Sequence, residues 1–89
     1  MTQNWYLIQF KRNSYRLAER NLNQQGFATF LPLQDFTGRK GSKFLANSKP
    51  LFPGYMFVTF DVDEAPWQKI NSTLGVSRLI CRNGIPIIV

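Results

Sequence analysis

Hydrophobic residues fall in short runs along the chain, and several of these runs predict β-strands. The clearest run covers residues 55–60, where successive side chains should point to opposite faces of a sheet. One face would carry Tyr55, Phe57 and Thr59. The other face would carry Met56, Val58 and Phe60. Further apolar runs predict strands at residues 5–10, 27–31 and 76–81.

The polar segment after the first run predicts a helix over residues 15–25. Ser14 is a favourable N-cap for this helix, and Gly26 can end it in a left-handed conformation. Its apolar face is narrow, so the helix must pack on a sheet to be stable. That face consists of Tyr15, Ala18, Leu22 and Gln25.

A second helix is predicted between the third and fourth strands. Asp63 can cap it, with Pro66 tolerated in its first turn. This helix would turn Trp67 and Ile70 inward and end before Gly75. After the fourth strand, the Asn-Gly pair at 83–84 predicts a turn, and residues 85–89 a further short strand.

Residues 34–48 have the weakest pattern of the chain. They contain a basic, glycine-rich turn at residues 38–43, which predicts a hairpin or a mobile loop that projects from the body. The basic residues of this turn are interpreted as a solvated tip, with contact to upstream DNA as the alternative. They are Arg39, Lys40 and Lys43.

The order strand, helix, strand, strand, helix, strand predicts a split β-α-β sandwich of the ferredoxin-like type. Four main antiparallel strands would form its sheet, and the helices would cover one face. The other face would stay open, and it would carry Tyr55 and Phe57 if Met56, Val58 and Phe60 face the helices. Large aromatic residues on an uncovered sheet form an exposed apolar patch, which usually marks a partner site.

Composition narrows the possible functions. The 89 residues suffice for one small domain, and 11 Lys and Arg against 5 Asp and Glu give a formal charge of +6. Acidic residues cluster at 61–64, so a basic face could contact a polyanion. The chain has no His and a single cysteine, Cys81, which we expect to be a buried small hydrophobe. An intrachain disulfide and the usual zinc cages are therefore excluded.

The sequence also argues against a membrane protein and against an enzyme. No apolar run reaches 18 residues, which indicates a cytoplasmic protein. Some small acyl-phosphate hydrolases share the expected topology and use an arginine with an asparagine, and Asn71 could serve. However, a glycine-rich phosphate loop beside the first strand is missing, as is a nucleophile paired with a base. We therefore expect no catalysis and no cofactor.

Three stretches of the chain resemble the N-terminal domain of the NusG/RfaH family of transcription elongation and antitermination factors. The most specific stretch is Lys-Pro-Leu-Phe-Pro-Gly-Tyr-Met-Phe-Val at residues 49–58. The others are Trp-Tyr-Leu-Ile at 5–8, followed by Lys-Arg at 11–12, and residues 67–76. The resemblance covers nearly the whole of residues 1–89. Family members also carry a C-terminal KOW domain, which we expect to be absent from this chain because it stops at Val89.

The resemblance implies a partner and a set of contact residues. In this family the domain docks on the clamp helices of the large catalytic subunit of RNA polymerase and favours processive, pause-resistant elongation. The apolar contact would be made by Leu7, Phe52, Pro53, Tyr55 and Phe57. The alternative is that Phe52, Tyr55 and Phe57 belong to the core of the domain. The tip of the second helix, which faces the opposite side of the polymerase cleft in the family, corresponds to Trp67 and Gln68.

The resemblance also implies contact with the non-template DNA strand. Lys11 matches a basic position of the family near that strand, and other basic residues lie close by in sequence, at Arg12, Arg16 and Arg20. The alternative is that these four residues form a solvated face. The sequence departs from RfaH-like relatives at Gln9, where an aromatic is usual, and at Leu74, where a basic residue is common.

Two other interpretations remain open. Trp5 and Trp67 are expected to be packing residues rather than contacts of a partner. An RNA-binding module of the RRM kind shares the expected topology and stacks bases on sheet aromatics, for which Tyr55 and Phe57 could serve. The Lys/Arg-Gly-aromatic submotif of those modules is missing from this chain.

Overall fold

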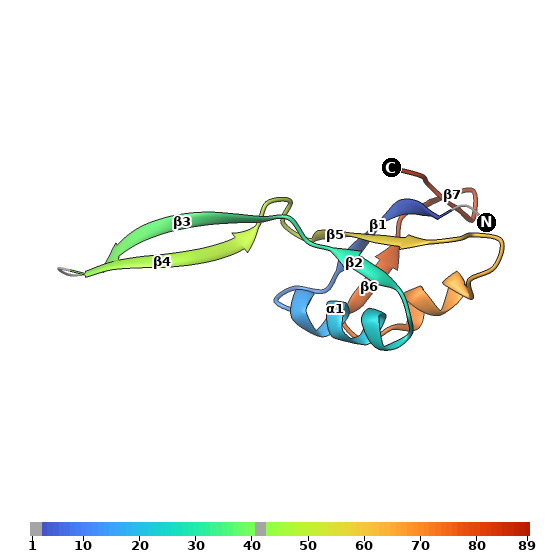
Figure 1. Cartoon of the computed structure of the whole chain (residues 1–89), viewed down its shortest axis with the longest axis horizontal. Coiled ribbons are helices and arrows are strands. Elements are labelled where there is room, and N and C mark those ends of the chain that lie inside the picture. Colours follow the sequence, from blue (N-terminus) through green and yellow to red (C-terminus); the bar gives the residue numbers. More distant parts are fainter. Residues whose placement is uncertain (1–2, 41–42) are drawn as a thin grey trace.

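The computed structural model describes residues 3–40 and 43–89. Its body is a four-stranded antiparallel sheet with the spatial order β2-β5-β1-β6. The strands in that order are β2 (Ala28–Phe30), β5 (Tyr55–Phe60), β1 (Asn4–Phe10) and β6 (Val76–Leu79). The helix α1 (Tyr15–Gln24) and the short 3₁₀-helix η1 (Trp67–Ser72) lie together on one side of this sheet (Figure 1). The predicted split β-α-β sandwich is therefore confirmed.

The core lies between the sheet and its helices. Strands β1 and β5 alternate between buried and partly exposed residues, and their buried sets face α1 and η1. The Tyr6 and Phe60 rings stack at 4.2 Å between centroids. The buried apolar residues are Tyr6, Ile8, Phe10, Ala18, Leu22, Phe27, Met56, Val58, Phe60, Ile70, Val76 and Leu79. Each larger side chain of this set stabilises the fold by about 1.5–3 kcal/mol.

Helix α1 is close to its prediction. It spans Tyr15–Gln24, and Gly26 follows with a φ of 92°, the left-handed conformation expected there. Ser14 is the N-cap residue, but its hydroxyl donates to the Arg12 carbonyl at 3.2 Å instead of capping a helix amide. Hydrogen bonds tie the helix to the η1 region: Gln25 Nε2 donates to Thr73 Oγ1 at 2.8 Å.

The second helix is shorter than predicted, and Asp63 does not cap it. Backbone amides of Glu64 and Ala65 both bond the Asp61 carbonyl, so turns occupy this segment. A proline disfavours the helical conformation in the residue before it, which keeps Ala65 out of the helix. The 3₁₀-helix therefore begins after Pro66, at Trp67.

Residues 33–50 form the predicted hairpin. Strands β3 (Leu33–Lys40) and β4 (Lys43–Pro50) pair from Leu33 opposite Pro50 to Lys40 opposite Lys43. The hairpin projects from one end of the sheet (Figure 1), and the molecule measures 54 × 23 × 22 Å. Part of the turn expected at residues 38–43 is strand, and residues 41–42 lie outside the described residues.

The fourth strand is also shorter than predicted. It ends at Leu79, and the chain then forms the small hairpin β7 (Cys81–Arg82) and β8 (Ile85–Pro86). Its turn is the predicted Asn83-Gly84 pair, with φ values of 53° and 78°. Cys81 is exposed, so the prediction of a buried cysteine is wrong: the chain leaves the sheet one residue earlier.

The last residues return to the sheet beside β1. The Ile80 amide donates to the Leu7 carbonyl at 2.9 Å, and the Val89 amide to the Trp5 carbonyl at 2.9 Å. Ile88 bridges Tyr6 in antiparallel fashion. This segment thus occupies the edge of β1 that β6 leaves free. Within the described ranges, no helix is long and apolar enough to cross a membrane.

Gly75 joins η1 to β6 where the loop touches α1, and we predict that Gly75→Ala strongly destabilises the protein. An added Cβ would lie 2.7 Å from the Ala18 amide nitrogen and 3.0 Å from its Cα, and Gly75 has a φ of 95°. Gly26→Ala is a matched control, because its φ is 92° but nothing lies within 4 Å of its added Cβ. Urea unfolding should show a loss of about 1–2 kcal/mol for the control and about 1–3 kcal/mol more for Gly75→Ala. Equal losses would show that the contact with Ala18 is unimportant.

Candidate functional site: the open face of the sheet

The sheet face opposite the helices carries the candidate site, which we call the open face. Pairing between strands arranges its side chains in rows. Phe57 lies opposite Leu7 on β1 and opposite Phe30 on β2, which forms an apolar row across three strands. A second row joins Trp5, Thr59 and Ala28 in the same way. The strand residues of the open face are Trp5, Leu7, Gln9, Ala28, Phe30, Tyr55, Phe57, Thr59 and Arg78.

Phe57 is the centre of an aromatic cluster on this face. Its ring stacks on Phe30, with centroids 6.2 Å apart and planes inclined by 28°. The Phe52 ring meets the Phe57 ring edge-on, with centroids 6.4 Å apart and ring planes inclined by 86°. Phe30 is 56% exposed and Phe52 is 51% exposed. The two outer rings thus hold Phe57 in place while offering their own faces to solvent.

Shallow hollows flank Phe57. One, of about 280 Å³, is lined by Leu7, Phe52, Tyr55, Phe57 and Val89. Another, of about 290 Å³, is lined by Trp5, Phe30, Phe57 and Val89. Their walls are almost entirely carbon, and they are wide open to solvent. Such a surface lacks the convergent polar groups of a small-molecule site and suits apolar side chains presented by another macromolecule.

The structure brings most of the predicted apolar contact residues together. Leu7, Phe52, Tyr55 and Phe57 line a single hollow. Pro53 is exposed but lies apart from that hollow, in a neighbouring cleft. The remaining predicted contacts lie in η1 on the helical side of the sheet. There Trp67 packs against the core, as expected for a packing residue, whereas Gln68 is exposed.

Three residues of the open face were missed by the sequence analysis. Trp5 was expected to be a packing residue, but it is 43% exposed on the open face, so that prediction is wrong. Alternation with the buried Tyr6 would have revealed it. Phe30 could be placed only with the register that sets it opposite Phe57. Val89 reaches the hollows because the chain end pairs with β1, which no local pattern signals.

The predicted DNA contacts form a separate basic group at the start of α1, consisting of Lys11, Arg12, Arg16 and Arg20. All four side chains are exposed. Arg16 lies over the Tyr15 ring, 5.6 Å from its centroid, and its Nε is 3.2 Å from the Tyr15 hydroxyl. This contact restrains one guanidinium next to an aromatic surface.

A cleft of about 290 Å³ lies between Arg12 of the basic group and the loop before β5. It is lined by Phe10, Arg12, Asn13, Tyr15, Pro50, Pro53 and Gly54. The Phe10 amide donates to the Gly54 carbonyl at 2.9 Å, so the loop before β5 is fixed against the end of β1. Arg12 therefore lies across the cleft from the loop that carries Phe52.

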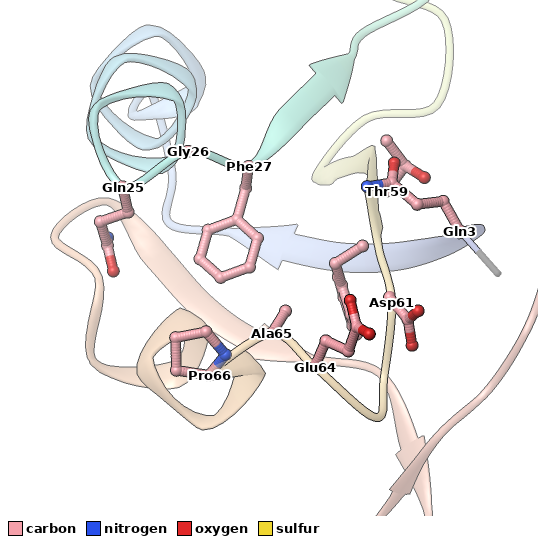
Figure 2. Close-up of a pocket in the computed structure, with 10 residues that line it drawn as sticks. Gln3, Gln25, Gly26, Phe27, Thr59, Asp61, Glu64, Ala65 and Pro66 are labelled. Carbon is pink, nitrogen blue, oxygen red and sulfur yellow. The ribbon is translucent and has the colours of Figure 1, made fainter. Parts of the chain in front are cut away.

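Another hollow, of about 260 Å³, lies at the edge of the sandwich near the ends of α1 and β5 (Figure 2). The ring of Phe27 and the methyl group of Ala65 point into it, and the carboxylates of Asp61 and Glu64 lie along another wall. Asp61 Oδ1 accepts the Asp63 amide at 3.0 Å, so this carboxylate shapes its own turn. In the described part of the chain, no group of three or more His, Cys, Asp and Glu could hold a metal.

Asn71, the residue considered for an acyl-phosphate site, has a structural contact instead. Its Oδ1 accepts the Leu79 amide at 2.8 Å and so links η1 to β6. That interaction uses the polar oxygen to satisfy a backbone amide of the sheet rather than to face a cleft. The geometry therefore favours a binding surface over a catalytic centre.

The fold and the open face define a class of protein, a small α/β sandwich with an uncovered aromatic sheet face. A family model described as "Transcription termination factor nusG" matches residues 3–89, and the chain belongs to the NusG family. A solved structure, "Domain interaction in Thermotoga maritima NusG", has the same fold, with a TM-score of 0.73 and 19% identity. The match covers 100% of this chain and 51% of that one.

Curated relatives agree with this assignment. The transcription termination/antitermination protein NusG of Helicobacter pylori is 30% identical over 92 residues, which cover 92% of this chain and 52% of that protein. The protein of the same description from Halalkalibacterium halodurans is 25% identical over 89 residues, 90% of this chain and 50% of the relative. The chain thus spans about half the length of the curated relatives it matches.

Proposed function

We propose that this chain acts in transcription termination or antitermination by docking its open face on the clamp helices of the large catalytic subunit of RNA polymerase. The observation that carries the proposal is the uncovered aromatic cluster around Phe57. Exposed contiguous apolar surface is unusual in a protein that acts alone, because it remains unfavourably hydrated until a partner covers it. Membership of the NusG family supports a partner within the transcription machinery.

The shape of the open face fits a pair of helices. A helix presents apolar side chains in a stripe with spacings of three and four residues. Hollows on both sides of Phe57 can each receive side chains from such a stripe, and Phe57 would then insert between the helices. Aromatic anchors in the middle of an interface commonly contribute most of its binding energy.

The proposed action on elongation is a shift of populations. A factor that binds one arrangement of the clamp more tightly than another favours the arrangement that it binds, by as much as its two affinities differ. The chain would thereby promote processive, pause-resistant elongation without any catalysis of its own. Its rigid sheet is suited to this role, because the open face rests on a packed core.

The basic group would contact the non-template DNA strand nearby. Its four exposed cations can neutralise phosphates without reading bases. The cleft between Arg12 and Pro53 supports this arrangement, because it places the basic group next to the Phe52 end of the open face. A polymerase-bound factor would then have DNA within reach of α1.

We predict that Phe57→Ala weakens binding to a clamp-helix fragment of bacterial RNA polymerase without unfolding the protein. Loss of this anchor should cost about 2 kcal/mol or more, roughly a 30-fold rise in Kd, because its ring fills the space between the hollows. Titration by isothermal calorimetry would measure the binding. A thermal melt would measure folding, which should stay cooperative because Phe57 lies outside the core.

Leu74→Ala is the matched control for this prediction. Leu74 is also an apolar side chain and is more exposed than Phe57, but it lies on the helical side, where its carbonyl accepts Asn21 Nδ2. Its truncation should leave the Kd unchanged. Unaltered binding by Phe57→Ala would contradict the proposed dock, and loss of its cooperative melt would return Phe57 to the core.

For single-stranded DNA, we predict a salt-dependent affinity with a log–log slope of about −2 to −3, as expected for three or four phosphate contacts. Fluorescence anisotropy with a labelled single-stranded oligonucleotide would measure it over a range of salt concentrations. The double variant Arg16→Ala/Arg20→Ala should flatten the slope by roughly 1.5, since two contacts are lost. A slope near zero for the unaltered protein would remove the DNA contact from the proposal.

Lys69→Ala serves as the control here, because Lys69 is an exposed cation in η1, away from the basic group.

The same oligonucleotide made as RNA tests the alternative of an RRM-like module. Low-micromolar RNA affinity that Phe57→Ala abolishes, together with no binding to the clamp-helix fragment, would favour that alternative over polymerase docking.

A further inference from the structure

Across the open face, the side chains change from an apolar row to a neighbouring row that ends in a cation on β6. The row next to the Phe30–Phe57–Leu7 row is polar: Gln9 lies opposite Tyr55 on β5 and opposite Arg78 on β6. On the same pair of strands, Ile8 lies opposite Leu79, and both are buried. Because neighbouring positions of a strand point to opposite faces, Arg78 shares the open face with Gln9.

Within the described part of the chain, one hydrogen bond holds Arg78 at this edge. Its Nε donates to Gln9 Oε1 at 3.2 Å. A guanidinium has five N–H groups, so most of its donors remain available to a partner. Both side chains lie toward solvent, and among the described residues no carboxylate contacts Arg78. Every other strand residue of the open face is uncharged.

We infer that Arg78 binds a carboxylate of the partner, an Asp or Glu side chain on the helix that covers the β6 edge of the open face. The inference rests on the proposed function and specifies the chemistry of its partner. Docking would remove water from the Tyr55–Gln9–Arg78 row as it covers Phe57. A guanidinium that loses water without gaining an acceptor destabilises a complex, so a matching partner supplies one.

A carboxylate is the acceptor that fits best. It can accept two parallel N–H groups of an arginine, and charge-assisted bonds of this kind are stronger than neutral ones. Gln9 offers a neutral oxygen, which orients the guanidinium without satisfying its charge. The formal charge of +6 on the chain also favours an acidic partner surface.

Charge reversal tests this inference against the same clamp-helix fragment. We predict that Arg78→Glu raises the Kd more than tenfold, because it sets two carboxylates against each other. Lys69→Glu is the matched control: it changes the net charge equally but lies in η1, on the other side of the sheet. Without DNA present, it should raise the Kd less than about threefold.

Rescue by the partner completes the test. Acidic residues of the fragment are changed to Lys one at a time, and one such change should restore the binding of Arg78→Glu at least tenfold while weakening the unaltered chain. Equal effects of Arg78→Glu and Lys69→Glu, or failure of every reversal to rescue, would overturn the inference. If the unaltered chain binds and Phe57→Ala does not, such a result leaves the dock intact. If the unaltered chain does not bind the fragment at all, the proposed function itself fails.

Discussion

The antiparallel pairing of β1 with β5 places Leu7 opposite Phe57 on one face and Tyr6 opposite Val58 on the other. A slip of one residue would exchange the faces of β1, so that Tyr6 and its buried neighbours would enter water. The cost of exposing those core residues fixes the register. The same register that builds the core therefore also assembles the apolar row of the open face, since the two faces of a strand cannot be set independently.

The sheet is covered on one face only, because both helical elements of the described residues pack on that face. Helix α1 and η1 lie on the same face, and contacts such as Gln25 with Thr73 and Asn71 with Leu79 hold them to each other and to β6. The close approach of Gly75 to Ala18 brings the two helical elements into one layer. Much of the remaining chain forms the hairpin β3–β4, which projects away from the sheet (Figure 1). The open face is thus a consequence of where the chain places its helices and its hairpin.

Local patterns in the sequence predicted the elements that depend on local physics. The alternation at residues 55–60, the left-handed end of α1 at Gly26 and the turn at Asn83-Gly84 all follow from side-chain period or backbone preference. Local patterns did not predict the positions of residues that depend on pairing between segments far apart in the sequence. Phe30 joins the open face through its pairing with Phe57, and Cys81 is exposed because residues 80–89 pair with β1 and with one another.

The gradient across the open face also bears on how a partner would be oriented. A purely apolar surface gives affinity but little direction, because a pair of helices could lie across it in either sense with similar burial. One cation at one edge removes that ambiguity, since only one orientation brings a carboxylate to Arg78 and the other leaves its charge desolvated. The apolar row would then supply most of the binding energy, and the polar row beside it would select the orientation. Both rows depend on Gln9 and Leu7 being two residues apart on β1, so affinity and direction are set by a single strand.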